Sequence, residues 1–187
     1  AYIEPRNRFQ EDYSAEYYGR LKTLERGVER IYDSPATIML SCSSTNLNAD
    51  DNLRCPADQM REIEGGRRTA RKTLYHILEG YEWCYARIWE PHQSGYGHQH
   101  IAVFVDDPDG ELSADDFEPF MSSYTDNTPG AGTDAHTNEP CDDHDDGSNP
   151  WRAAESGCSD CDVPVSVNHD VEDIAGYLSE YLGIYGE

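Results

Sequence analysis

Positively charged residues are scarce in this sequence, and lysine is almost missing. The 187 residues hold 14 lysines and arginines against 37 aspartates and glutamates, so the formal net charge is −23 at pH 7. Lys22 and Lys72 are the only lysines. A chain this acidic repels nucleic acid unless its few cations are gathered in one place. The composition therefore excludes a broadly basic nucleic-acid-binding surface.

Long apolar runs are also missing. No stretch approaches the roughly 20 apolar residues of a membrane-spanning helix, and no signal peptide is visible, so we expect a cytoplasmic protein with no membrane partner. Excess acid, scarce lysine and low hydrophobicity indicate a high-salt cytoplasm, where a Debye length of about 3 Å at 1 M salt screens self-repulsion. Intrinsic disorder would give a similar composition. Thirteen tyrosines, three tryptophans and clear strand patterns argue against it for most of the chain.

The length and the mixture of helical and strand patterns predict a single domain, 1–187, of the α+β class. Apolar spacing predicts helices over 12–32, 57–78, 113–124 and 170–185, and strands over 36–44, 85–90, 98–105 and 163–167. We expect Gly65 and Gly66 to break or kink the second helix. Residues 125–162, rich in Asp, Asn, Gly and Thr, are expected to form an insertion.

A hairpin over residues 85–106 contains the first candidate site. Aromatic and β-branched residues on both sides of a Pro, Ser and Gly turn predict two strands. His98 and His100 are two residues apart and so lie on one face of the second strand, and Glu90 ends the first strand beside them. Two imidazoles and a carboxylate would leave a bound divalent cation with the open position that a catalytic metal needs. The alternative is a pair of surface histidines next to a turn.

Two pairs of potential ligands in the insertion form a second candidate site. Cys141 and His144 are separated by two residues, as are Cys158 and Cys161, and thirteen residues lie between the pairs. This spacing is close to that of structural Zn²⁺ sites with four nitrogen or sulfur ligands. Bound zinc would also explain how a segment with few apolar residues keeps a shape. The alternative is free or disulfide-linked cysteines in a disordered acidic loop.

The densest group of cations lies in the second predicted helix. It consists of Arg61, Arg67, Arg68, Arg71 and Lys72. Such a group is usually a solvated helix face. In a chain this acidic, its concentration in one segment instead favours a surface that contacts phosphates.

The hairpin resembles a known motif. Residues 90–100 follow the pattern Glu-Pro-His-x-x-Gly-x-x-His-x-His and precede aliphatic residues, as in the metal-binding motif of HUH endonucleases, the initiators of rolling-circle replication. Gln99 stands where that family usually has a hydrophobic residue. Leu40-Ser41, at the end of an aliphatic strand, resembles the family's first motif. Residues 177–181, Tyr-Leu-Ser-Glu-Tyr, resemble its two-tyrosine third motif, with Glu180 in place of a lysine.

The resemblance implies a fold and a chemistry. The fold would be a central antiparallel sheet flanked by helices. Glu90, His98 and His100 would hold Mn²⁺ or Mg²⁺, and Tyr177 or Tyr181 would attack a scissile phosphate. The DNA would be a single strand at a replication origin, contacted by Ser41 and the basic group, with one of its arginines or the metal replacing the missing lysine. The product would be a 5′-phosphotyrosine link and a free 3′-hydroxyl for the host replication machinery.

Three alternatives stay open at this point. A conjugative relaxase shares the chemistry, but most relaxases have their tyrosine near the N-terminus. A single-strand transposase is disfavoured by the presence of two tyrosines. A non-catalytic, zinc-binding, DNA-associated regulator would use the Cys/His pairs as its main feature.

The charge makes a prediction about salt. A net charge of −23 destabilises the compact state when it is unscreened, so we expect the fold to need molar salt. Circular dichroism recorded while salt is removed should show unfolding. A fold that is fully stable in dilute buffer would contradict the high-salt interpretation.

Overall fold

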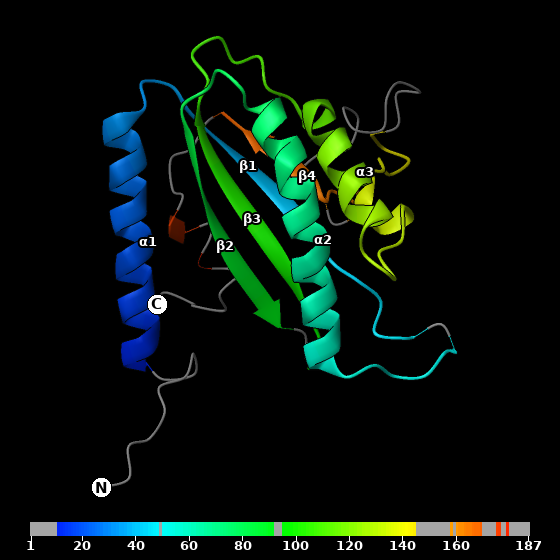
Figure 1. Ribbon diagram of the computed structural model, residues 1–187. Coiled ribbons are helices and arrows are strands. Elements are labelled where there is room, and N and C mark those ends of the chain that lie inside the picture. Colours follow the sequence, from blue (N-terminus) through cyan, green and yellow to red (C-terminus); the bar gives the residue numbers. More distant parts are fainter. Residues whose placement is uncertain are drawn as a thin grey trace, which may run out of the picture.

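A four-stranded antiparallel sheet with helices on both faces forms the centre of the molecule (Figure 1). The computed structural model describes residues 11–48, 50–91, 95–144, 158, 160–169, 175–176 and 179. The sheet order is β2-β3-β1-β4, and this architecture confirms the α+β prediction. The elements are α1 (Glu11–Ile31), β1 (Pro35–Cys42), α2 (Pro56–Ile77), β2 (Trp83–Pro91), β3 (Gly97–Asp106), η1 (Ala114–Phe117), α3 (Glu118–Asp126), η2 (Asp134–His136) and β4 (Val165–Asn168).

The two faces of the sheet contact different layers. Side chains alternate between the faces of a strand, so on β3 Ile101, Val103 and Val105 face α2 and α3. Ala102 and Phe104 face the opposite way, towards α1. His98 and His100 belong by register to this second face. The candidate metal ligands therefore lie on the α1 side of the sheet.

The thicker part of the core lies between the sheet and the pair α2 and α3, which run side by side (Figure 1). Its most buried large side chains are Ile38, Leu40, Ile63, Leu78, Ile101, Phe117, Phe120, Met121 and Tyr124. Each large apolar side chain buried in this way stabilises the fold by about 1.5–3 kcal/mol. This layer holds the strands in place while the other face carries the polar site.

Helix α2 is continuous, so the predicted break at Gly65 and Gly66 is wrong. Gly66 is buried, and a Cβ atom added to it would overlap the Thr128 hydroxyl and lie 3.3 Å from the Tyr124 ring. The glycine lets the helix approach the end of α3. Gly65 is exposed and meets nothing within 4 Å. Packing against α3 therefore requires a glycine at position 66 but not at position 65.

The single helix predicted over 113–124 is divided. Asp116 accepts hydrogen bonds from the backbone N–H and the hydroxyl of Ser113, which starts the short 3₁₀ turn η1. Helix α3 then begins anew with Pro119 in its first turn. Proline is favoured there because it has no backbone N–H to leave unpaired.

The two glycines of α2 give a matched test of the packing. Replacing Gly66 by Ala should lower the free energy of unfolding by about 1–3 kcal/mol, because the methyl group overpacks the contact with Thr128. Gly65→Ala should leave it unchanged or raise it by up to about 1 kcal/mol, since alanine is the better helix former. Chemical denaturation of both variants in the same high-salt buffer measures the difference. Equal effects would contradict the close approach.

Candidate metal centre

Three side chains from the β2–β3 hairpin meet at one point. Glu90 Oε2 lies 3.0 Å from His98 Nε2 and 2.9 Å from His100 Nε2, and the two imidazole nitrogens are 2.7 Å apart. The rings are nearly perpendicular, at 85°. Two imidazoles and a carboxylate that all point at one spot form a set of donors suited to a divalent cation.

The strand register produces this convergence. Glu90 is paired with His98 across the β2–β3 ladder, and Ile88 is paired with His100. Directly opposed residues have their side chains on the same face of the sheet, and so do residues two apart on one strand. The hairpin alone therefore brings the three donors together.

The distances between the donor atoms fit an octahedral cation. Ligands at right angles with metal bonds of about 2.0–2.1 Å lie about 2.8–3.0 Å apart. Tetrahedral ligands at the same bond length would lie about 3.3–3.4 Å apart. The observed separations of 2.7–3.0 Å are closer to the first arrangement than to the second. Three donors at these separations would leave further positions on a bound ion for water or substrate.

Ser41 holds one of the imidazoles in place. It is paired with His100 in the β1–β3 ladder, and its hydroxyl lies 3.0 Å from His100 Nδ1. With Nδ1–H donating to Ser41 Oγ, the lone pair of Nε2 points to the other two donors. The sequence resemblance assigned Ser41 to DNA contact. The structure gives it a contact with His100, which the one-dimensional pattern could not reveal.

The site opens to solvent on one side. The His100 side chain is 5% exposed, that of His98 19% and that of Glu90 37%. A ligand would therefore approach over Glu90 and His98, while His100 forms the buried wall.

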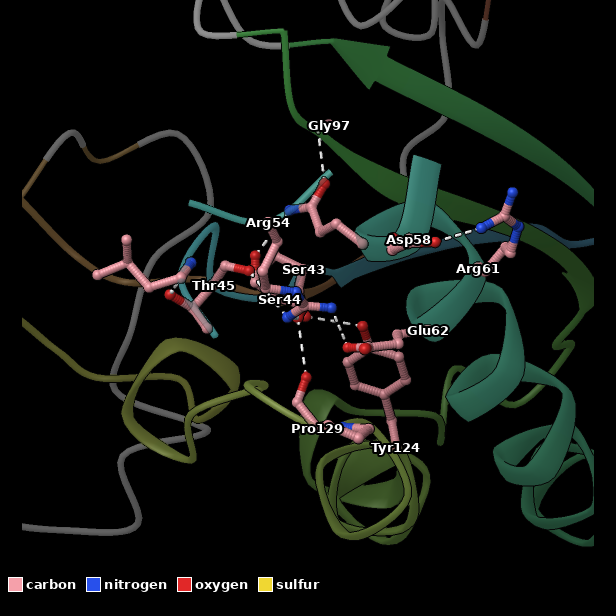
Figure 2. Close-up of polar contacts among 12 residues, drawn as sticks. Ser43, Ser44, Thr45, Arg54, Asp58, Arg61, Glu62, Gly97, Tyr124 and Pro129 are labelled. Carbon is pink, nitrogen blue, oxygen red and sulfur yellow. Dashed lines mark hydrogen bonds and ion pairs between the residues drawn. The ribbon is translucent and has the colours of Figure 1, made fainter. Parts of the chain in front are cut away.

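The end of the sheet that contains the site is braced from the α2 side (Figure 2). Gln59 donates to the Ser44 carbonyl at 2.8 Å and accepts from the Gly97 backbone N–H at 3.3 Å, so it joins the end of β1 to the start of β3. Tyr124 donates to the Ser43 carbonyl at 2.7 Å. Arg54 binds the Ser44 hydroxyl and forms an ion pair with Glu62. These bonds limit the movement of both strands that position His98 and His100.

Gln99 points away from the site. It is fully buried on the α2 side, between Cys42 and Trp89 in the ladder, and neither its amide oxygen nor its nitrogen has a hydrogen-bond partner among the described residues. A buried amide left in this state costs about 1–3 kcal/mol. Nothing among the described residues explains why a glutamine stands here.

The basic group of α2 is only partly a surface. Arg67 is buried and binds Glu64 at 2.8 and 3.0 Å, so its assignment to an exposed phosphate-contacting face is wrong. Arg68 and Arg87 also bind Glu64. The hydrogen bond from Arg67 is the largest influence that lowers the pKa of Glu64, to about 2. One carboxylate therefore holds three guanidinium groups together.

The other cations of that group are exposed, but they belong to α2 and so lie on the opposite side of the sheet from the metal ligands. Arg61 is paired with Asp58, and the Arg71 guanidinium lies 5.7 Å from the centre of the Tyr75 ring. Arg68 and Lys72 are also exposed. A DNA strand that touched both α2 and Glu90 would have to pass around an edge or the end of the sheet.

Tyr177 and Tyr181 lie outside the described residues. Ala175, Gly176 and Ser179, which are described, are helical. Ala175 is fully buried among the apolar side chains on the α1 face, and its backbone N–H donates to Glu25 at 3.2 Å. Ala175 therefore packs on the same sheet face as His98 and His100.

The Cys/His pairs of the insertion also come together. The ligand atoms of Cys141, His144, Cys158 and Cys161 all lie within 4.8 Å of one another. This cluster could hold a metal such as zinc. It is separate from the Glu90 cluster.

These observations define the class of the chain: an α+β protein with two groups of potential metal-ligand side chains. Residues 2–187 match the family described as "Putative rep protein (DUF1424)", and the chain belongs to this family. An "Uncharacterized 36 kDa protein" of Halobacterium salinarum is 32% identical over 182 residues, which are 96% of this chain and 54% of the relative. A protein of the same description from Halobacterium sp. (strain GN101) is 29% identical over 189 residues, with the same coverage.

The chain spans about half the length of these curated relatives. No solved structure matches it significantly. Among the residues that the structure describes, no helix has the length and apolar character to cross a membrane.

Metal binding at this centre can be tested directly. The wild-type protein should bind one Mn²⁺ ion with anomalous density between Glu90, His98 and His100, and His98→Ala should abolish binding. Ser41→Ala should weaken it by about 10–100-fold, because His100 loses the partner that orients its ring. Calorimetric titration with Mn²⁺ gives the affinities.

Ser43→Ala serves as the matched control. Ser43 lies two residues further along, and its hydroxyl contacts His136 rather than a ligand. Its substitution should leave the Mn²⁺ affinity unchanged. Anomalous density elsewhere would contradict the assignment.

Proposed function

We propose that the protein cleaves and rejoins single-stranded DNA at a replication origin and so initiates rolling-circle replication. The observation that supports this most is the convergence of Glu90, His98 and His100, with donor atoms 2.7–3.0 Å apart, on an open side of the sheet. Membership of the Rep family agrees with a role in replication. The order of the three motifs resembles that of HUH endonucleases, and this resemblance supplies the chemistry.

The ligand residues have distinct tasks in this proposal. Glu90, His98 and His100 would hold Mn²⁺ or Mg²⁺, and the bound ion would polarise a phosphate and offset its developing negative charge. Ser41 keeps the His100 ring in the orientation and tautomer that its role requires. Glu90 and His98 face the solvent side, so the scissile phosphate approaches there.

Tyr177 and Tyr181 are the proposed nucleophiles. The oxygen of one tyrosine forms a bond to phosphorus, and the bond from phosphorus to the 3′ oxygen breaks. The phenolic proton passes to solvent, and the leaving oxygen takes up a proton. The products are a 5′-phosphotyrosine link and a 3′-hydroxyl that the host replication machinery extends. After one round, the second tyrosine attacks the regenerated origin phosphate and frees a new 3′-hydroxyl. This hydroxyl attacks the first phosphotyrosine, which closes the circle and releases the first tyrosine.

The position of neighbouring residues supports this choice of nucleophile. Ala175 and Ser179, on either side of Tyr177, are helical and buried, and Ala175 packs on the sheet face that holds His98 and His100. Residues four apart on a helix are separated by about 6 Å along the axis and by about 40° beyond a full turn. Two tyrosines at this spacing can therefore serve one phosphate with a modest shift of protein or DNA.

The acid content affects how DNA is bound. Because the protein has a net charge of −23, binding through the phosphate backbone of DNA alone would be weak, and high salt would weaken it further. We therefore expect recognition to depend on the metal and on unpaired bases, with Arg61, Arg68, Arg71 and Lys72 making a minor contribution. A single-stranded target suits this, since its phosphate and bases are both accessible.

The Cys/His cluster supports a second candidate, a non-catalytic zinc-binding regulator associated with DNA. Such a protein has no need for the Glu90, His98 and His100 arrangement. Relaxases and single-strand transposases share the chemistry of the main proposal and differ in substrate.

The assignment of Tyr177 and Tyr181 as nucleophiles predicts the outcome of a covalent-adduct assay. Incubation of a labelled origin oligonucleotide with protein and Mn²⁺ should give an adduct that survives a denaturing gel. Each single variant, Tyr177→Phe or Tyr181→Phe, should retain one nucleophile, and the double variant should form no adduct. Tyr185→Phe is the control and should behave like wild type, because the helix predicted over 170–185 would put Tyr185 a further turn away from the phosphate.

Two results would contradict the proposal. An adduct formed by the double variant would place the nucleophile elsewhere. The lack of any adduct with wild-type protein that binds Mn²⁺ and is folded by circular dichroism would favour the regulator.

A further inference from the structure

The Cys/His cluster of the insertion lies beside the edge of the sheet, next to the segment that enters β4. We propose that Cys141, His144, Cys158 and Cys161 bind one structural zinc ion, and that this ion holds β4 in its place against β1. The proposal does not depend on the nicking chemistry.

The distances within the cluster fit tetrahedral zinc. Thiolates bound at about 2.3 Å in a tetrahedron lie about 3.8 Å apart, and Cys141 Sγ is 3.9 Å from Cys158 Sγ and 3.6 Å from Cys161 Sγ. His144 Nδ1 lies 3.2 Å and 3.3 Å from the sulfurs of Cys141 and Cys161, slightly less than the about 3.5 Å between nitrogen and sulfur ligands of tetrahedral zinc. Both sulfur separations are well beyond the roughly 2.05 Å of a disulfide bond.

The donor set identifies the metal and its role. Three thiolates and one imidazole select zinc over hard cations such as Mg²⁺ or Ca²⁺. Four protein ligands fill the tetrahedron and leave no position for substrate, as in structural sites. The Cys141 backbone N–H also points to Cys161 Sγ at 3.4 Å, a contact that stabilises a metal-bound thiolate.

Backbone bonds connect the cluster to the sheet. Glu139 and Asp162 exchange two N–H to carbonyl bonds, at 2.8 and 2.9 Å, just outside the first and last ligands. The side chain of Asn138 donates to the Val165 carbonyl at 2.8 Å and accepts from its N–H at 3.0 Å. The cluster therefore closes a loop whose two ends are both joined to the start of β4.

A third anchor joins the insertion to Ser43, the residue that follows β1. His136 is buried, and its Nε2 accepts from the Ser43 backbone N–H at 3.1 Å while Nδ1 donates to the Gly132 carbonyl at 2.6 Å. Burial lowers the pKa of His136, so the ring is neutral at pH 7, as this pair of bonds requires. Both ring nitrogens of His136 are used in these bonds, so this histidine acts as an anchor.

The position of β4 matters for the other metal centre. The Ser41 backbone N–H donates to the Pro164 carbonyl at 2.8 Å, and the Ser41 side chain contacts His100. Cys161 is three residues before Pro164. With few apolar side chains of its own, the insertion needs the ion to keep this connection in place.

The first test is the zinc content of protein purified without chelator. Elemental analysis should find about one zinc ion per chain in the wild type and less than about a tenth of that in Cys158→Ser. Cys55→Ser is the matched control, because Cys55 is an exposed free thiol at the start of α2 and makes no side-chain cap bond. His144→Cys should keep the zinc, since four thiolates also bind it, whereas His144→Ala should lose it.

The second test concerns β4. Removal of the zinc by Cys158→Ser should raise the hydrogen-exchange rates of the β4 amides at least about tenfold and leave those of the β2–β3 hairpin unchanged. His98→Ala should lose Mn²⁺ binding and keep its zinc, so failure of the two metal centres can be told apart.

Wild-type protein without zinc, or with a Cys158–Cys161 disulfide in a non-reducing peptide map, would overturn the zinc site. Unchanged β4 exchange in zinc-free protein would overturn its role.

Discussion

The pairing register of β2 with β3 is the constraint on which the rest of the structure depends. It joins Trp83 to Val105 at one end and Pro91 to Gly97 at the other. A slip by one residue would move every side chain of a strand to the other face. It would put His98 and His100 into the apolar layer under α2 and turn Val103 towards α1. Core and metal centre are therefore specified by the same hydrogen bonds.

The metal centre needs more than the hairpin. The hairpin supplies all three donors, but β1 supplies the hydroxyl that orients His100, and Gln59 of α2 joins β1 to the start of β3. The sheet therefore separates two tasks. The α2 side is filled with apolar side chains and gives rigidity, whereas the α1 side, with its smaller apolar cluster, leaves room for polar donors.

The sequence was informative where short-range spacing decides the structure. Alternation located the hairpin and placed His98 and His100 on one face, and the Cys/His spacing anticipated the cluster of the insertion. Features that depend on packing between distant segments were missed. The contact of Gly66 with Thr128, the burial of Arg67 against Glu64 and the anchoring of His136 by Ser43 join residues that no periodicity connects. The restart of α3 at Pro119 had a visible signal in the proline.

The side chain of Asn138 has a consequence for self-association. Strand β4 is at the edge of the sheet, and an edge strand offers unpaired N–H and carbonyl groups to a strand of another molecule. The amide of Asn138 occupies both outward groups of Val165 and so takes the place of a neighbouring strand. At this position of β4 a strand of another molecule finds no free backbone group, and this protection does not weaken when salt screens the charges that keep acidic molecules apart.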